Sequence, residues 1–123
     1  MTDRSKKVVT TRGGKTDGWG FVIRTNTGDA IAAGARSLEA VRDVLCAEAE
    51  ACHSGVVVAM EQEIGRIIIE TGSSILVIAL QSDKYHLSAG GAIFAEIKYL
   101  FYLEFVEASV FTRLVLVIVL RMN

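Results

Sequence analysis

The sequence predicts one α/β domain in which helices pack on a mixed sheet, and three observations lead to this fold class. Trp19–Thr25 and Ala30–Ala35 read as strands joined by the turn Asn26–Asp29, which predicts an antiparallel hairpin. Leu38–Ile64 places apolar residues at helical spacing, which predicts a long helix. Arg66–Thr71 contains an unbroken isoleucine run, typical of a strand covered on both faces. A hairpin, a long helix and a buried strand in this order imply a mixed sheet with packed helices.

Length and composition exclude several classes of protein. The chain has 123 residues, 51% of them hydrophobic, and a formal net charge of −1. This length suits one domain, and the composition excludes a disordered chain. The net charge provides no overall attraction to nucleic acid or to a membrane surface. No signal peptide is recognisable, and the seven apolar residues Leu114–Leu120 are too few to span a bilayer. We therefore expect an intracellular protein with no membrane partner.

The N-terminal segment, residues 1–17, is polar, and we expect it to be irregular apart from one short strand at Lys7–Thr11. Its basic residues are Arg4, Lys6, Lys7, Arg12 and Lys15. A solvated chain terminus explains them and is the interpretation we favour. The alternative is a weak arm that contacts phosphates.

The long helix has recognisable end signals. Ser37 is a suitable N-cap, and Gly65 is expected to end the helix. Cys46 and Cys52 both lie on this helix, separated by a rise of about 9 Å, so they cannot form a disulfide within it. Their positions suit a reducing compartment or small buried side chains, and no zinc-binding pattern accompanies them.

The second half of the chain continues with helices and a last strand. Residues 72–80 predict a short helix, and residues 81–91 a polar loop. A third helix follows, with one apolar stripe that consists of Ile93, Phe94, Ile97, Leu100 and Phe101. Val106–Phe111 alternates and predicts the last strand. Residues 112–123 form a divergent apolar tail.

Glu48 is the first candidate for a functional residue. At about 100° per residue it lies on the apolar side of the long helix, among Val41, Leu45, Cys52 and Ala59. A carboxylate that faces a core is unfavourable unless it has a partner or a metal ion. The position therefore indicates either a functional role or a specific polar partner.

Four segments together resemble a known family. They are Gly18–Arg24, Ala47–Ala49, Ile69–Ser73 and Leu80–Asp83. They resemble the ribonuclease H type 1 fold, in particular the divergent reverse transcriptase-like branch that is common in plant genomes and transposon-derived reading frames. The resemblance covers about residues 18–111. It implies a ribonuclease H-like fold and, for the family, hydrolysis of RNA in RNA–DNA hybrids by two Mg²⁺ ions.

The resemblance also implies a set of acidic residues, and most of them are missing. Glu48 occupies the family's helix position. Gly72 replaces the Asp at the end of the central strand. The first-strand Asp falls on Arg12, with Asp17 as a rival placement, and no Asp follows Asp83. One carboxylate cannot hold two Mg²⁺ ions against their hydration, so we expect Glu48 to be at most a single metal ligand and no Mg²⁺ to bind stably.

Two neighbours of Gly72 have alternative interpretations. Glu70 could supply a second oxygen ligand, but we favour a role as a cap of the following helix or a pairing with a lysine. Gly72-Ser73-Ser74 could receive a phosphate at a helix N-terminus, but an ordinary N-cap at Ser73 or Ser74 is the interpretation we favour.

The predicted function follows from these losses. We expect a ribonuclease H-like protein that is catalytically impaired and binds nucleic acid, such as an RNA–DNA hybrid, only weakly. The alternative is a vestigial domain of a transposon-derived reading frame without enzymatic activity. Such a domain would self-associate through its apolar tail, Leu114–Leu120, because an unpaired β-branched run tends to aggregate.

Overall fold

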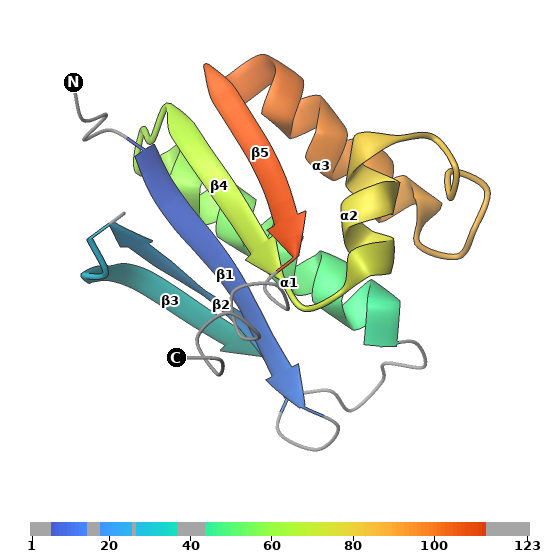
Figure 1. Cartoon of the computed structure of the whole chain (residues 1–123), viewed down its shortest axis with the longest axis horizontal. Helices are drawn as coiled ribbons and strands as arrows, with labels where there is room; N and C mark the ends of the chain where they lie inside the picture. Colours follow the sequence, from blue (N-terminus) through green and yellow to red (C-terminus); the bar gives the residue numbers. More distant parts are fainter. Residues whose placement is uncertain (1–5, 15–17, 26, 37–43, 113–123) are drawn as a thin grey trace, which may run out of the picture.

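A computed structural model of the chain describes residues 6–14, 18–25, 27–36 and 44–112. A five-stranded mixed sheet has the strand order β3-β2-β1-β4-β5 (Figure 1). Helix α1 crosses behind this sheet in the view of Figure 1, and helix α3 packs against α1. The predicted α/β class with a mixed sheet is confirmed.

The N-terminal half of the sheet is antiparallel. Strand β1 (Lys6–Gly14) pairs with β2 (Gly18–Thr25), which pairs in turn with β3 (Ala30–Arg36). The predicted hairpin is therefore confirmed, and its turn uses the positive φ of +107° at Gly28, a conformation that glycine adopts freely. Strand β1 extends beyond the predicted Lys7–Thr11, so part of the segment expected to be irregular lies inside the sheet.

The C-terminal half of the sheet is parallel. Strand β4 (Arg66–Thr71) pairs with β1, and β5 (Glu107–Thr112) pairs with β4. Ile67 and Ile69 are fully buried, whereas Ile68 is half-buried. The expectation of a strand covered on both faces is therefore only partly correct.

Helix α1 (Val44–Glu61) is shorter than the predicted helix at its C-terminal end. Glu63, with φ of +59°, adopts the left-handed conformation that ends the helix, and Ile64 donates its backbone N–H to the carbonyl of Ala59. The prediction that Gly65 ends the helix is therefore wrong. The carbonyl of Gly65 instead accepts the backbone N–H of Val106 at 2.7 Å.

Two shorter helices complete the described structure. Helix α2 (Ser74–Gln81) and helix α3 (Gly91–Glu104) are joined by the predicted polar loop. Phe94 and Ile97 of the predicted α3 stripe are buried in the core. None of the helices in the described part of the chain is both long and apolar enough to cross a membrane.

A glycine allows α1 to approach the sheet closely. A Cβ atom at Gly55 would lie 2.7 Å from Cγ1 of Val9 and 3.1 Å from Cγ of Phe21. Both distances are too short for a carbon–carbon contact, so only glycine fits here without movement. This close approach brings the start of α1, which carries Glu48, against the ends of β1 and β4.

Some predicted features lie outside the described residues. They are the cap Ser37, the helical residues 38–43, the alternative acid Asp17 and the apolar tail Leu114–Leu120.

Candidate functional site

Glu48 is buried at the junction of α1 with the centre of the sheet, with 6% of its surface exposed. Its Oε1 atom accepts a hydrogen bond from Oγ1 of Thr11 on β1 at 3.3 Å and a short one from Oγ1 of Thr71 on β4. The carboxylate therefore points at the end of β4, as the sequence predicted. Its observed partners are hydroxyl groups.

The two threonines lie side by side because β1 and β4 are parallel. Their last registered pair is Thr10 with Glu70, and Thr11 and Thr71 are the next residues on each strand. Oγ1 of Thr71 also accepts the backbone N–H of Ser73 at 3.2 Å. The hydroxyls thus connect the Glu48 carboxylate to the start of α2, and they satisfy an acid that would otherwise be unfavourable in this position.

Cys52 lies one helical turn after Glu48 and is fully buried. Burial, and secondly the charge of Glu48, raise the pKa of the Cys52 thiol to about 12. The thiol is therefore protonated at neutral pH and is not a nucleophile. Both cysteines are free, as their spacing predicted.

Glu70 belongs to a separate cluster on the other face of the sheet. Successive side chains of a strand point to opposite faces, so Glu70 points away from the side of Thr71 and Glu48. Its Oε1 atom accepts hydrogen bonds from Oγ1 of Thr10 at 3.1 Å and from Nη2 of Arg24 at 2.5 Å. The expected lysine partner was wrong, since the partner is an arginine.

The position of Gly72 is exposed and directly follows β4. Arg12 lies on β1, where its backbone pairs with Gly20. The registered pairing of β1 with β4 ends at Thr10 and Glu70, and Asp17 lies outside the described residues, so the match of Arg12 or Asp17 to the first-strand acid stays a prediction.

The start of α2 is an ordinary helix cap. The side chain of Ser73 accepts the backbone N–H of Leu76 at 3.1 Å. The cap at Ser73 agrees with the interpretation favoured for Gly72-Ser73-Ser74. The expected capping role of Glu70 is wrong, because its carboxylate is held by Thr10 and Arg24. The alternative cap at Ser74 is wrong, because Ser74 is the first helical residue.

The Glu48 site does not suit a pair of Mg²⁺ ions. Magnesium prefers several converging oxygen ligands, but the residues around Glu48 supply one carboxylate and two hydroxyls that donate to it. Across the described ranges, no three His, Cys, Asp or Glu side chains are arranged to hold a metal ion. The donor set therefore does not fit the family's cofactor.

Sequence reasoning missed the hydroxyl partners and Arg24. The threonines Thr10, Thr11 and Thr71 read as ordinary strand residues, because threonine is frequent in strands. No local signal marked these threonines, because their contacts depend on how β1 aligns with β4. Arg24 lies in Gly18–Arg24, one of the segments that resemble the family, but nothing in that segment indicates that its partner is Glu70.

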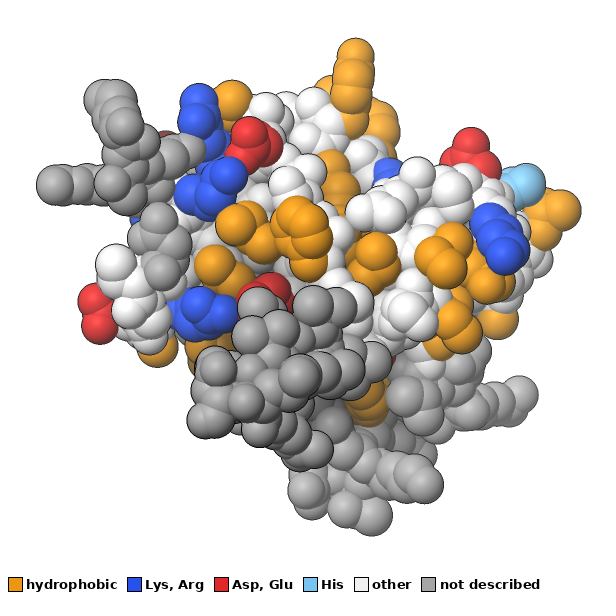
Figure 2. All heavy atoms as spheres, in the orientation of Figure 1, with side chains coloured by type: hydrophobic (Ala, Val, Ile, Leu, Met, Phe, Trp, Pro, Cys, Tyr) orange, Lys and Arg blue, Asp and Glu red, His pale blue; other side chains and the backbone are white. Residues whose placement is uncertain are grey.

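The molecular surface in this view has mixed character. Figure 2 shows Lys and Arg side chains interspersed with acidic and apolar ones, with no continuous basic area among the coloured residues. Lys6 is partly neutralised, since its Nζ atom lies 2.6 Å from Oε1 of Glu107. The described surface on this side therefore offers only limited attraction to phosphates.

Comparison with known proteins agrees with this fold. A model of the reverse transcriptase-like family matches residues 7–111. RNase H1 from the halophilic archaeon Halobacterium salinarum has a TM-score of 0.64 at 14% identity, covering 87% of this chain and 83% of its own. The N-terminal RNase H domain of a Mycobacterium tuberculosis protein has a TM-score of 0.73 at 14% identity, covering 87% and 81%.

A third similar structure is that of LC11-RNase H1 in complex with an RNA/DNA hybrid. Its TM-score is 0.65 at 14% identity, with coverage of 87% of this chain and 83% of that protein. No curated protein matches the sequence. The TM-scores of these structures show a shared fold, and the family match covers most of the sequence. The chain therefore belongs to the reverse transcriptase-like family and has an RNase H-like domain.

Proposed function

We propose that this chain is a catalytically impaired RNase H-like domain that binds RNA–DNA hybrids weakly and does not cleave them. The observation that supports this most directly is the environment of Glu48. Its carboxylate is engaged by the hydroxyls of Thr11 and Thr71. Two-metal hydrolysis needs several carboxylates around a pair of ions, and this site provides one.

The other nearby acid cannot complete the set. Glu70 lies on the opposite face of the sheet, and its carboxylate is held by Arg24 and Thr10. A metal ion bound to Glu48 therefore cannot reach Glu70 across the intervening strand. Gly72 has no side chain to offer, and Arg12, the residue matched to the first-strand acid, is not an acid.

Hybrid binding is proposed on the strength of the fold and a similar structure. LC11-RNase H1 was solved with an RNA/DNA hybrid, and this chain has the same fold. The net charge of −1 and the mixed surface of Figure 2 support weak binding. Because most of the attraction to nucleic acid is electrostatic, the affinity should fall steeply as salt concentration rises.

Activity assays should show no cleavage of an RNA–DNA hybrid with either Mg²⁺ or Mn²⁺. Binding should still be detectable at low salt as a change in the fluorescence anisotropy of a labelled hybrid. Gly72→Asp alone should not restore cleavage, because one further carboxylate still leaves Arg12 in place of the first-strand acid. The double variant Arg12→Asp/Gly72→Asp tests whether the two lost acids suffice for measurable activity.

The control for this assay is Glu48→Gln, which retains the shape of the side chain and removes its charge. Wild-type cleavage that disappears in Glu48→Gln would overturn the proposal. Loss of binding to the hybrid at all salt concentrations, with cleavage also absent, would instead support the vestigial alternative.

Self-association through the C-terminal tail is a second candidate, and the position of β5 favours it. Strand β5 is one of the two edge strands of the described sheet and ends at Thr112. The seven apolar residues Leu114–Leu120 follow this edge almost directly. Phe111 on β5 is also 56% exposed, so the edge already carries apolar surface. The edge is partly capped, since Nε2 of Gln81 donates to the carbonyl of Val110 at 3.1 Å, but strand edges with apolar neighbours promote pairing between chains.

A truncation after Thr112 tests the role of the tail. Thr112 is retained because it belongs to β5. If the tail links chains, its removal should raise solubility and lower the oligomer mass measured by light scattering. A matched control replaces Val115 and Val117 with lysine in the full-length chain and should have the same effect. A truncated protein that is less soluble or unfolded would show that the tail is part of this domain's own core.

A further inference from the structure

The described sheet has two edge strands, and they differ in what lies along them. At the β5 edge, α2 packs against the strand and Nε2 of Gln81 donates to the carbonyl of Val110. At the other edge, β3 pairs with β2 on its inner side, and the described sheet contains no strand on its outer side. The outer backbone N–H and C=O groups of β3 are therefore a template for a further strand.

The regular part of β3 carries few of the features that prevent edge pairing. The strand has one extra residue against β2, Ile31, and then pairs regularly over residues 32–36. Residues 32–35 include no charge, no proline and no side chain larger than a methyl group. Edge strands commonly use charges, prolines or bulges to prevent pairing, and the bulge at Ile31 protects only the first end of β3. Ala33 and Ala35 are exposed, and their side chains are too small to shield the backbone edge.

Two copies of this segment fit each other in antiparallel orientation. A two-fold axis at Gly34 pairs Ala33 of each copy with Ala35 of the other and uses the whole regular run. Asp29 precedes the strand and Arg36 is its last residue. Antiparallel pairing therefore brings ends of unlike charge together, whereas parallel pairing would align like charges.

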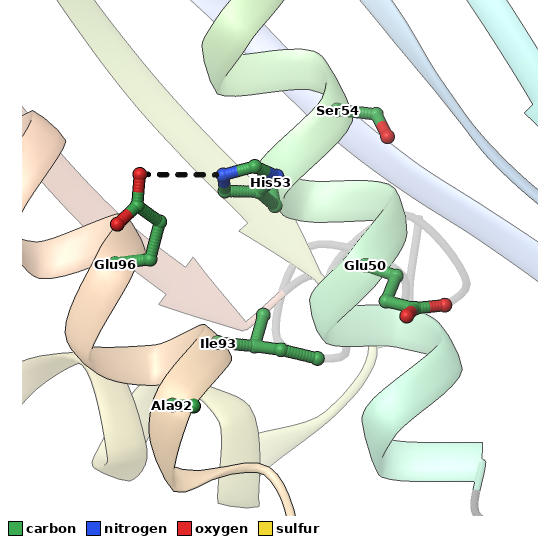
Figure 3. A pocket seen from close by; sticks show the side chains of 6 residues that line it. All are labelled: Glu50, His53, Ser54, Ala92, Ile93 and Glu96. Carbon is green, nitrogen blue, oxygen red and sulfur yellow. Dashed lines mark ion pairs between the residues drawn. The ribbon is translucent and has the colours of Figure 1, made fainter.

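The helices leave room for a second copy at this edge. Helix α1 packs on β2 and β1, and Figure 1 shows α2 and α3 on the side of β5. In Figure 3, His53 of α1 points at Glu96 of α3 across a hollow of about 290 Å³, with Nε2 and Oε1 3.9 Å apart, so α1 meets this helix on the side away from β3. In a pairing along β3, the two β2 strands lie three strand spacings apart, about 14 Å. Packed helices need only about 8–10 Å, so the two α1 helices do not collide.

We propose that β3 is the interface of a two-fold homodimer, in which two copies pair antiparallel along this edge and join their sheets into one. Strand β3 runs parallel to β1, because each is antiparallel to β2. The two Glu48 sites therefore lie at opposite ends of the joined sheet, and each remains outside the interface. The contact is also independent of the apolar tail, which follows the other edge strand, β5.

Sedimentation equilibrium of the full-length chain tests this interface. All variants carry Val115→Lys/Val117→Lys, which removes any association through the tail, and this background protein should show a monomer–dimer equilibrium. Adding Ala33→Lys/Ala35→Lys places like charges opposite each other and should raise the dimer Kd at least about tenfold. Adding Ala33→Lys/Ala35→Glu instead places unlike charges opposite each other and should return the Kd to within about threefold of the background value.

A matched control places the same two charges elsewhere. Ala92→Lys/Ala95→Lys adds them to exposed positions of α3, away from β3, and should leave the Kd unchanged. Ala33 and Ala35 are also exposed, so the β3 variants should fold normally, and circular dichroism with Tm measurement checks this.

Four outcomes would overturn the β3 interface. They are a background protein that stays monomeric, a Kd that the two lysines on β3 leave unchanged, an equal loss of affinity in the control on α3, and a Lys/Glu variant as weak as the Lys/Lys variant. A monomeric background protein whose wild-type counterpart forms oligomers would assign the association to the tail alone.

Discussion

Arg24→Met will destabilise the protein by about 2–3 kcal/mol, because it leaves the Glu70 carboxylate without its positive partner. The side chain of Glu70 is 11% exposed, and that of Arg24 is 32% exposed. Removing one member of a buried pair generally costs about 3–5 kcal/mol, and the partial exposure of Arg24 moderates this. Urea denaturation at neutral pH measures the loss.

Two variants show whether the unpaired charge is the cause. Arg24→Met/Glu70→Gln removes the charge that Arg24 neutralised and should recover much of the lost stability. Lys6→Met breaks a more exposed ion pair with Glu107, whose side chains are 28% and 46% exposed, and should cost less than about 1 kcal/mol. Equal losses in Arg24→Met and Lys6→Met would contradict the buried-charge explanation.

Alkaline pH will destabilise the protein through Cys52. In the folded chain the pKa of this thiol is raised from 9.0 to about 12 by burial and by the charge of Glu48. The unfolded chain releases the proton near pH 9, whereas the folded chain keeps it. The stabilisation linked to this proton is therefore complete below pH 9 and is lost as the pH rises toward 12, by about 1.4 kcal/mol per pH unit.

A Cys52→Ala variant isolates this contribution. Its unfolding free energy should decrease less steeply between pH 9 and pH 10.5 than that of the wild type, while lysines and tyrosines titrate equally in both. Labelling provides a second measurement, since a thiol reagent should modify Cys52 only after unfolding. Identical pH slopes in the two proteins, or rapid labelling of Cys52 in the native state, would contradict the assigned shift.

The arrangement of elements was predictable because each strand and helix carries a local signal. The isoleucine run of β4 and the apolar stripe of α3 are the buried parts of these elements. Burial of this kind appears in the sequence as a pattern of apolar residues, so both elements could be predicted. The end of β1 was not predictable in this way. Arg12, Gly13 and Gly14 belonged to the segment expected to be irregular, but pairing with β2 holds them in the sheet.

In the candidate site, Glu48 could be predicted from the sequence, but its hydrogen-bond partners could not. Glu48 was visible in the sequence because an acid interrupts an apolar helix face. Its hydroxyl partners depend on how β1 and β4 align, and Thr11 and Thr71 are separated by most of the domain. The pair of Arg24 and Glu70 depends further on the strand order, since Arg24 on β2 must reach across β1 to Glu70 on β4. Such contacts follow from topology, which local patterns do not contain.

The central position of β1 has a consequence for the way the chain folds during synthesis. Strand β1 is made first, but its parallel neighbour β4 contacts it across sixty residues, as in the bond from Thr10 to Glu70. Until the ribosome has released residue 71, one edge of β1 has no partner, and the nascent chain holds only the antiparallel half of its sheet. Contacts over such separations slow folding. The emerging protein should therefore depend on chaperones most strongly between completion of β3 and release of β4.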